Sequence, residues 1–142
     1  MSTAPGLEPV VLVCDDDAAL RATIVEALET ESLTVDTADR AVDAIQKVMR
    51  RAYGALLLDL KLPGLGGLDA IGILKRFDES LPIIVMTGHA SYGTEQAARV
   101  AGIFYYLVKP FTLDELTQAV RAALRSRSGL GPEPSRPPAQ AG

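Results

Sequence analysis

Acidic, hydroxyl and amine side chains stand at the ends of four apolar runs in this sequence. They are Asp15, Asp16, Asp17, Asp59, Thr87 and Lys109. Carboxylates held within a few ångströms repel one another, by about 3 kcal/mol for each pair at roughly 5 Å and an effective dielectric constant of about 20. A divalent cation relieves this repulsion, and an all-oxygen ligand set favours Mg²⁺ over zinc. If the fold brings the four runs together, these side chains predict a magnesium site.

The same side chains suit phosphoryl transfer. A carboxylate can accept a phosphoryl group and form an aspartyl phosphate. Asp59 stands alone at the end of the apolar run 55–59, which makes it the natural nucleophile. A lysine beside the metal would neutralise further negative charge, and the hydroxyl of Thr87 would donate a hydrogen bond to a phosphoryl oxygen.

Simpler roles exist for two of these features. One aspartate of the run 15–17 would be enough to cap a following helix. Three consecutive aspartates exceed that need, which favours the metal site. Lys109 would be an ordinary surface lysine, except that it directly precedes Pro110 at the end of a strand. A Lys-Pro peptide in that place is a candidate for the cis form.

The apolar runs alternate with amphipathic segments along the chain. Strands are expected at 10–14, 35–38, 55–59, 83–87 and 104–108, the second being more polar, as suits an edge strand. Helices are expected at about 18–31, 40–51, 68–77 and 91–101, and after the capping residue Thr112. This alternation predicts an α/β fold, a single domain in which helices cover both faces of a parallel sheet. Ligand sites in such sheets lie at the carboxyl ends of the strands, where the acidic residues stand.

Apolar stripes predict which side of each helix points inward. Residues three or four apart lie on one face of a helix, so a stripe with this spacing marks the side that packs on the sheet. The stripes are Leu20, Ile24 and Leu28 in the first helix, Val42, Ile45, Met49 and Ala52 in the second, and Leu113, Leu116, Val120 and Leu124 in the last.

Composition narrows the class of protein. The 142 residues are 48% apolar and 23% charged with a net charge of −4, which is ordinary for a globular domain and argues against nucleic-acid binding as the main activity. The single cysteine, Cys14, excludes an internal disulfide framework. No apolar run approaches the roughly 18–20 residues of a membrane span, and residues 1–9 lack a secretory signature. We therefore expect a cytoplasmic location and no membrane contact.

Prolines concentrate near the two ends of the sequence. Residues 1–9 are expected to be disordered, residues 10–127 to fold, and residues 128–142, rich in proline and glycine, to form a tail or linker.

Four motifs follow one another along residues 9–126. They are Val11-Leu12-Val13-Cys14-Asp15-Asp16-Asp17 with Arg21 following, Leu58-Asp59-Leu60-Lys61-Leu62-Pro63-Gly64, Ile83-Ile84-Val85-Met86-Thr87-Gly88-His89, and Tyr106-Leu107-Val108-Lys109-Pro110-Phe111. Each motif alone is modestly specific, but all four in this order and at this spacing are highly specific. In these motifs the sequence resembles the CheY-like receiver domains of bacterial two-component response regulators. The resemblance implies a flavodoxin-like, five-stranded parallel sheet with strand order 2-1-3-4-5.

The resemblance also implies roles for individual residues. Asp59 matches the phospho-acceptor, and Lys109 and Thr87 match the groups that hold the phosphoryl oxygens. Asp16 matches the more direct Mg²⁺ ligand of the acidic pair, while Asp15 acts mostly through water. The implied metal ligands are Asp15, Asp16, Asp59 and the backbone carbonyl of Lys61.

Tyr106 matches the aromatic switch of the family, which turns inward when Thr87 moves toward the phosphate. By strand alternation we expect its side chain to face outward and that of Tyr105 to face inward or to be partly buried.

The resemblance implies a phosphorylation-regulated switch rather than an enzyme that turns over a substrate. A sensor histidine kinase would donate the phosphoryl group. The face made by the fourth helix, fifth strand and fifth helix would then change its affinity for an output protein or output domain. In many relatives that face forms a homodimer. No direct contact of this domain with nucleic acid is expected.

Two other classes of protein share parts of this pattern. A flavin or nucleotide binder with the same sheet needs a phosphate-cradling first loop, where this chain has Asp15–Asp17. A hydrolase that forms an aspartyl phosphate usually has a second acid two residues after its nucleophile, and position 61 is lysine. Visible absorption by bound flavin, or multiple turnover of a phosphate ester, would support these alternatives.

Overall fold

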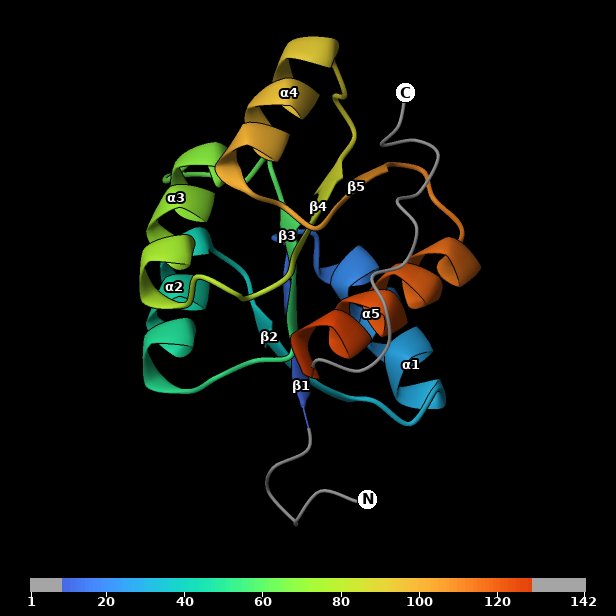
Figure 1. Cartoon of the computed structure of the whole chain (residues 1–142). Coiled ribbons are helices and arrows are strands. Elements are labelled where there is room, and N and C mark those ends of the chain that lie inside the picture. Colours follow the sequence, from blue (N-terminus) through green and yellow to red (C-terminus); the bar gives the residue numbers. More distant parts are fainter. Residues whose placement is uncertain (1–8, 129–142) are drawn as a thin grey trace.

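Strands and helices alternate along residues 9–128, the part of the chain that the computed structural model describes (Figure 1). The strands are β1 (Val10–Cys14), β2 (Thr34–Ala38), β3 (Ala55–Asp59), β4 (Ile83–Thr87) and β5 (Tyr105–Val108). The helices are α1 (Ala18–Thr30), α2 (Ala41–Arg50), α3 (Gly67–Phe77), α4 (Tyr92–Ala101) and α5 (Leu113–Ser128). Every predicted element is present, and the bounds differ from the expected ones only at element ends, where such boundaries are least sharp.

All strands belong to one parallel sheet in the order β2-β1-β3-β4-β5, which confirms the predicted fold class and strand order. The strands β1, β3 and β4 are buried along their whole length, as their continuous apolar sequences require. The more polar β2 lies at an edge of the sheet and is only partly buried.

Two helical layers cover the sheet, with α2, α3 and α4 on one face and α1 and α5 on the other (Figure 1). Alternation along β1 divides its side chains between the two layers. Leu12 and Cys14 belong to the core under α2 and α3, whereas Val11 and Val13 belong to the core under α1 and α5. Both faces of the sheet are therefore closed by apolar packing, and the polar chemistry is left to its ends.

The strand register aligns the ends that carry the predicted site residues. Cys14 pairs with Leu58, and Asp59 pairs with Met86, so the residues that follow β1 and those that end β3 and β4 lie at one level. Thr87 in turn pairs with Val108, which places Lys109 one residue beyond the same edge. The parallel register thus brings residues far apart in sequence to the carboxyl end of the sheet.

Two predicted helix faces need correction. In α2 the side chains of Val42 and Met49 are 49% and 56% exposed, whereas Ile45 is buried as predicted, together with Ala41, Ala44 and Val48. Ala52 is exposed and lies beyond the end of the helix at Arg50. The small side chains of Ala41 and Ala44 let the helix approach the sheet closely. The helix therefore packs on its alanine side, and Val42 and Met49 face away from the sheet. In α5, Leu113 is exposed at the first turn, whereas Leu116 and Val120 are buried as predicted.

The predicted end segments lie almost entirely outside the described residues, which begin at Pro9 and end with Ser128. None of the helices in that range has both the length and the apolarity that crossing a membrane requires.

Candidate functional site

Three carboxylates gather at the carboxyl end of the sheet. Asp15, Asp16 and Asp59 each offer an oxygen, and these oxygens all lie within 4.8 Å of one another. Asp15 and Asp59 are buried, with 0% and 4% of their surface exposed, whereas Asp16 is exposed. Such a group of oxygen ligands is able to hold a metal ion.

The loop between β1 and α1 gives each of its aspartates a different task. Asp17 caps α1, because its Oδ1 accepts hydrogen bonds from the backbone N–H groups of Ala19 and Leu20 at 3.0 and 3.1 Å. Asp15 Oδ1 accepts the N–H of Asp17 at 2.9 Å, which fixes the turn. Asp16 has no hydrogen bond or ion pair with any other described residue. Capping therefore accounts for one of the three aspartates and leaves the other two for the site.

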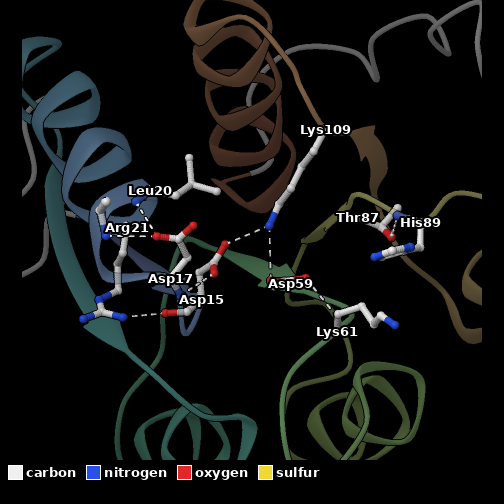
Figure 2. A network of polar contacts seen from close by, with 10 residues as sticks. Asp15, Asp17, Leu20, Arg21, Asp59, Lys61, Thr87, His89 and Lys109 are labelled. Carbon is white, nitrogen blue, oxygen red and sulfur yellow. Dashed lines mark hydrogen bonds and ion pairs between the residues drawn. The ribbon is translucent and has the colours of Figure 1, made fainter.

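Lys109 joins the two buried carboxylates. Its Nζ lies 3.2 Å from Asp15 Oδ2 and 3.2 Å from Asp59 Oδ2, reaching the site from the end of β5 (Figure 2). Burial of the ammonium group lowers the pKa of Lys109, but the carboxylates of Asp59 and Asp15 outweigh it, so this pKa lies above its ordinary value. Lys109 is thus held in its charged form. The Lys109–Pro110 peptide bond is cis, in agreement with the sequence-based suggestion.

The surroundings of Asp59 disfavour its charged form more strongly than Lys109 stabilises it. Its burial raises its pKa, and the nearby charge of Asp15 raises it further. The N–H of Lys61, which donates to Asp59 Oδ1 at 2.9 Å, and the ammonium of Lys109 act in the opposite direction. The net pKa shift is upward, so ionised Asp59 is destabilised where it lies.

The loop after Asp59 stays close to the site. Gly67 begins α3, and a side-chain carbon there would lie 2.7 Å from the backbone Cα of Leu60, so only glycine fits without displacing the chain. The Lys61 side chain is exposed, while its backbone N–H faces Asp59. The peptide of Lys61, rather than its amine, is therefore the part of this residue that the structure brings to the site.

Thr87 ends β4 on the other side of Asp59 from Asp15 (Figure 2). It is 1% exposed, and its Oγ1 accepts the N–H of His89 at 3.0 Å. Thr87, Lys61 and His89 line a groove of about 330 Å³ that opens beside Asp59. The structure thus places Thr87 next to the acidic cluster, with its hydroxyl engaged by the loop that leads to α4.

The predicted outward orientation of Tyr106 is wrong, whereas Tyr105 is partly buried as predicted. Tyr106 is 6% exposed and packs in the core shared with α3 and α4, whereas Tyr105 is partly buried against the opposite layer. The two side chains do alternate, but Tyr106 takes the side of its pairing partner Val85, which faces the α3 and α4 layer. The hydroxyl of Tyr106 has no hydrogen-bond partner among the described residues. Burial, with the charge of Glu95 adding to it, raises the pKa of this tyrosine.

One contact at the site was not predicted from the sequence. Arg21, which follows the three aspartates of the first motif, donates from Nη1 to the backbone carbonyl of Asp15 at 2.6 Å (Figure 2). A signal was present, because a cation near the amino end of a helix opposes the helix dipole and so suggests another purpose.

The sequence is similar to known proteins of one family. Residues 11–121 match the family model of the response regulator receiver domain. Response regulator MprA of Mycobacterium leprae (strain TN) is 37% identical over 115 residues, which cover 81% of this chain and 50% of that protein. The chain therefore spans about half the length of the curated relatives it matches.

Solved structures agree as well. The receiver domain of sensor histidine kinase PA1611 from Pseudomonas aeruginosa PAO1, with a magnesium ion coordinated in its active-site cleft, is 26% identical and has a TM-score of 0.76 over 82% of this chain and 98% of that one. The beryllofluoride-activated NtrC4 receiver domain dimer is 28% identical, with a TM-score of 0.79 over 83% and 98% of the two chains. With a matching family model, fold and arrangement of carboxylates, this chain belongs to the response regulator receiver domain family, the phospho-acceptor signalling domains of two-component systems.

Proposed function

We propose that Asp59 accepts a phosphoryl group from a sensor histidine kinase, in a site that Asp15, Asp16, Thr87 and Lys109 complete. The observation that carries the proposal is the buried Asp59, whose Oδ2 lies 3.2 Å from Lys109 Nζ within a cluster that holds two further carboxylates. Asp59 lies between the acidic loop and Thr87 (Figure 2). The groove lined by Thr87 and Lys61 adjoins this position, because Lys61 donates its backbone N–H to Asp59.

The donor set fits Mg²⁺. The proposed ligands are the three clustered carboxylates of Asp15, Asp16 and Asp59 and the backbone carbonyl of Lys61, all of them oxygen donors. The exposed carboxylate of Asp16 has no other partner in the described chain and remains free to bind a cation. When bound, Mg²⁺ would offset the carboxylate charge and coordinate the oxygens of the transferring group.

The protein groups have distinct tasks in the transfer. A carboxylate oxygen of Asp59 attacks phosphorus in line, the new P–O bond forms as the P–N bond of a phosphohistidine breaks, and the imidazole leaves with the electron pair. The ammonium of Lys109 already lies at Asp59 and carries charge toward the phosphoryl oxygens. The hydroxyl of Thr87 donates to a phosphoryl oxygen once it turns from its present contact with His89.

Phosphorylated Asp59 would change the face made by α4, β5 and α5. Thr87 and His89 are linked by a hydrogen bond, so a turn of the Thr87 hydroxyl toward the phosphoryl group releases the loop that leads to α4. Tyr106 already points inward in this structure, and its buried hydroxyl lies unpaired in the core under α4. The face made by α4, β5 and α5 thereby changes its affinity for an output protein or output domain, or for a second copy of the chain.

Phosphorylation rather than substrate turnover is the proposed activity. A hydrolase of phosphate esters would carry a second acid two residues after the nucleophile, and this chain has Lys61 there, with its side chain exposed. The domain boundaries that go with this function are residues 10–127 for the receiver unit and 128–142 for a tail or linker, as the proline and glycine content suggests.

The test is labelling by a phosphorylated histidine kinase and, separately, by a small acyl phosphate with Mg²⁺. Asp59→Ala should abolish labelling with both donors, because the nucleophile is gone. Asp43→Ala is the matched control, since it removes a partly exposed aspartate of α2 that lies outside the groove beside Thr87, and it should label like the parent chain. Full labelling of Asp59→Ala would overturn the proposal, as would multiple turnover of a phosphate ester by the parent chain.

A further inference from the structure

Arg21 lies behind the acidic loop, on the side away from Lys109 (Figure 2). It is the fourth residue of α1, and its side chain folds back so that Nη1 donates to the carbonyl oxygen of Asp15 at 2.6 Å. The Arg21 side chain is partly buried. The backbone N–H of Arg21 donates to the carbonyl of Asp17 at 2.9 Å, in the first turn of the helix. Arg21 is therefore fixed to the loop at two points.

Helix stability does not explain a cation in this position. The amino end of a helix carries partial positive charge, which disfavours an arginine close to it. The helix is already capped by Asp17, and its first turn contains no acidic residue for Arg21 to pair with. The short, charge-assisted bond to Asp15 is the one hydrogen bond that the Arg21 side chain makes within residues 9–128.

This bond completes the restraint of Asp15. Its carboxylate is held by the N–H of Asp17 and by Lys109, and its carbonyl is held by Arg21. The Asp15 carbonyl belongs to the same planar peptide unit as the N–H of Asp16. Holding that plane therefore orients Asp16, whose carboxylate has no other described partner.

We propose that Arg21 is a positioning residue for the metal site: by fixing the Asp15–Asp16 peptide it holds the Asp16 carboxylate where a divalent cation binds. This inference rests on the metal site of the proposed function. It assigns a role to a residue that touches neither the metal nor the phosphoryl group, in the way that outer residues orient the ligands of other metal sites.

The charge of Arg21 and its positioning of Asp16 predict opposite effects on Mg²⁺ affinity when Arg21 is replaced. If Arg21 acted only through its positive charge, it would repel a dication, and removing that charge would tighten Mg²⁺ binding. If Arg21 positions Asp16, removing it would loosen a ligand and weaken Mg²⁺ binding. Arg21→Met, which keeps an apolar stem and loses the guanidinium, separates the two.

The experiment measures the Kd of Mg²⁺ by calorimetric titration of the 142-residue chain. Arg21→Met should weaken binding about 10-fold or more. Arg50→Met is the matched control, because Arg50 lines the same groove of about 370 Å³ as Arg21 but has no contact with the acidic loop. It should leave the affinity unchanged or slightly tighter. Unchanged or tighter binding by Arg21→Met would overturn the proposal.

Two further measurements keep the test decisive. Thermal unfolding without Mg²⁺ shows whether Arg21→Met is folded. If it is not, Arg21→Gln, with a side chain too short for the same bond, takes its place with the same expected sign. At saturating Mg²⁺ the variant should recover the parent's rate of labelling by a small acyl phosphate, and a rate that stays low would overturn a purely positioning role.

The outcomes also separate this inference from the proposed function. A parent chain that binds Mg²⁺ without being phosphorylated on Asp59 would remove the proposed function alone, and the Arg21 result would still stand. Equal Mg²⁺ affinity in the parent and Arg21→Met, together with phosphorylation of Asp59, would remove the Arg21 inference alone.

Discussion

At the carboxyl end of the sheet Asp15, Asp16 and Asp59 crowd together, and Lys109 pairs with two of them. At the amino end, beside the start of β4, Asp78 forms an ion pair with the guanidinium of Arg127. Both clusters join segments far apart in sequence, and both are partly shielded from water. They differ in whether the charges balance.

The amino-end cluster satisfies its charged groups. Arg127, near the end of α5, donates to both carboxylate oxygens of Asp78 and, at 2.8 Å, to the hydroxyl of Ser80. Lys75 donates to the backbone carbonyls of Glu79 and Leu81. These bonds fasten the loop between α3 and β4 to the far end of α5 and leave the paired groups with little capacity for a ligand.

The carboxyl-end cluster is arranged in the opposite way. Its carboxylates outnumber the cation that pairs with them among the described residues, and the pKa of Asp59 is raised by burial and by Asp15. A balanced cluster stabilises the fold, whereas an unbalanced one lowers stability and keeps the capacity to bind a cation or react. The difference assigns a structural role to one end and the chemistry to the other.

Removing Lys109 should have the largest effect on stability. Lys109→Met leaves the buried carboxylates of Asp15 and Asp59 without their cation, which should cost about 3 kcal/mol in the free energy of unfolding measured by urea without Mg²⁺. Arg76→Met, which removes an exposed cation of α3, is the control and should change little. Equal stability of Lys109→Met and the parent would show that the carboxylates do not need this partner.

Breaking the amino-end cluster should be almost as costly. Asp78→Asn leaves the largely buried guanidinium of Arg127 without an anion and should lower the free energy of unfolding by about 2 kcal/mol. Asp69→Asn, which changes an exposed acid of the preceding helix α3, is the control. Because the cluster lies away from the metal site, the loss should be the same with and without Mg²⁺. A loss that Mg²⁺ reverses would contradict the separation of the two ends.

Mg²⁺ should stabilise the folded chain through the carboxyl-end cluster and not through the amino-end cluster. At ten times its Kd, Mg²⁺ should add about 1.4 kcal/mol to the free energy of unfolding of the parent chain. Asp16→Asn should abolish this gain, and Asp78→Asn should keep it in full. The measurement is thermal or urea unfolding across a Mg²⁺ titration, and an undiminished gain in Asp16→Asn would remove Asp16 from the site.

Neutralising Asp59 should have the smallest effect, with a sign opposite to that of Asp78→Asn. The pKa of Asp59 is raised in the folded chain, so ionisation of this group costs folding stability once the pH exceeds its ordinary value of 3.8. Asp59→Asn removes that cost and should stabilise the metal-free chain by about 1 kcal/mol near pH 7. The gain over the parent should shrink as the pH falls through the raised pKa of Asp59 toward 3.8. A gain that does not depend on pH, or a loss, would contradict the described imbalance.

Sequence reasoning identifies the edge of the sheet but not every orientation there. Apolar runs ending in Asp59 and Thr87 were enough to predict that parallel strands would bring these residues together, and the register does so. The orientation of Tyr106 could not be predicted in the same way, because the run 104–108 is apolar or aromatic throughout and contains no alternation to set its phase.

Two other features depend on tertiary packing. The inward face of α2 includes Ala41, Ala44 and Val48 beside the predicted Ile45, in place of Val42 and Met49, since the sequence alone does not show how closely the helix approaches the sheet. The pairing of Asp78 with Arg127, 49 residues apart, has no local signal at either residue. Such contacts follow from the fold and cannot be predicted from spacing.

If the carboxyl end of the sheet is the reactive one, as we propose, Asp59 is the residue that takes the phosphoryl group. The most direct test is to treat the parent chain with a small acyl phosphate and Mg²⁺, and to locate the added phosphoryl group by fragment mass spectrometry. We expect a single phosphoryl group, on the peptide that contains Asp59, and none without Mg²⁺. A phosphoryl group on Asp15, Asp16 or His89, with Asp59 unmodified, would contradict this proposal.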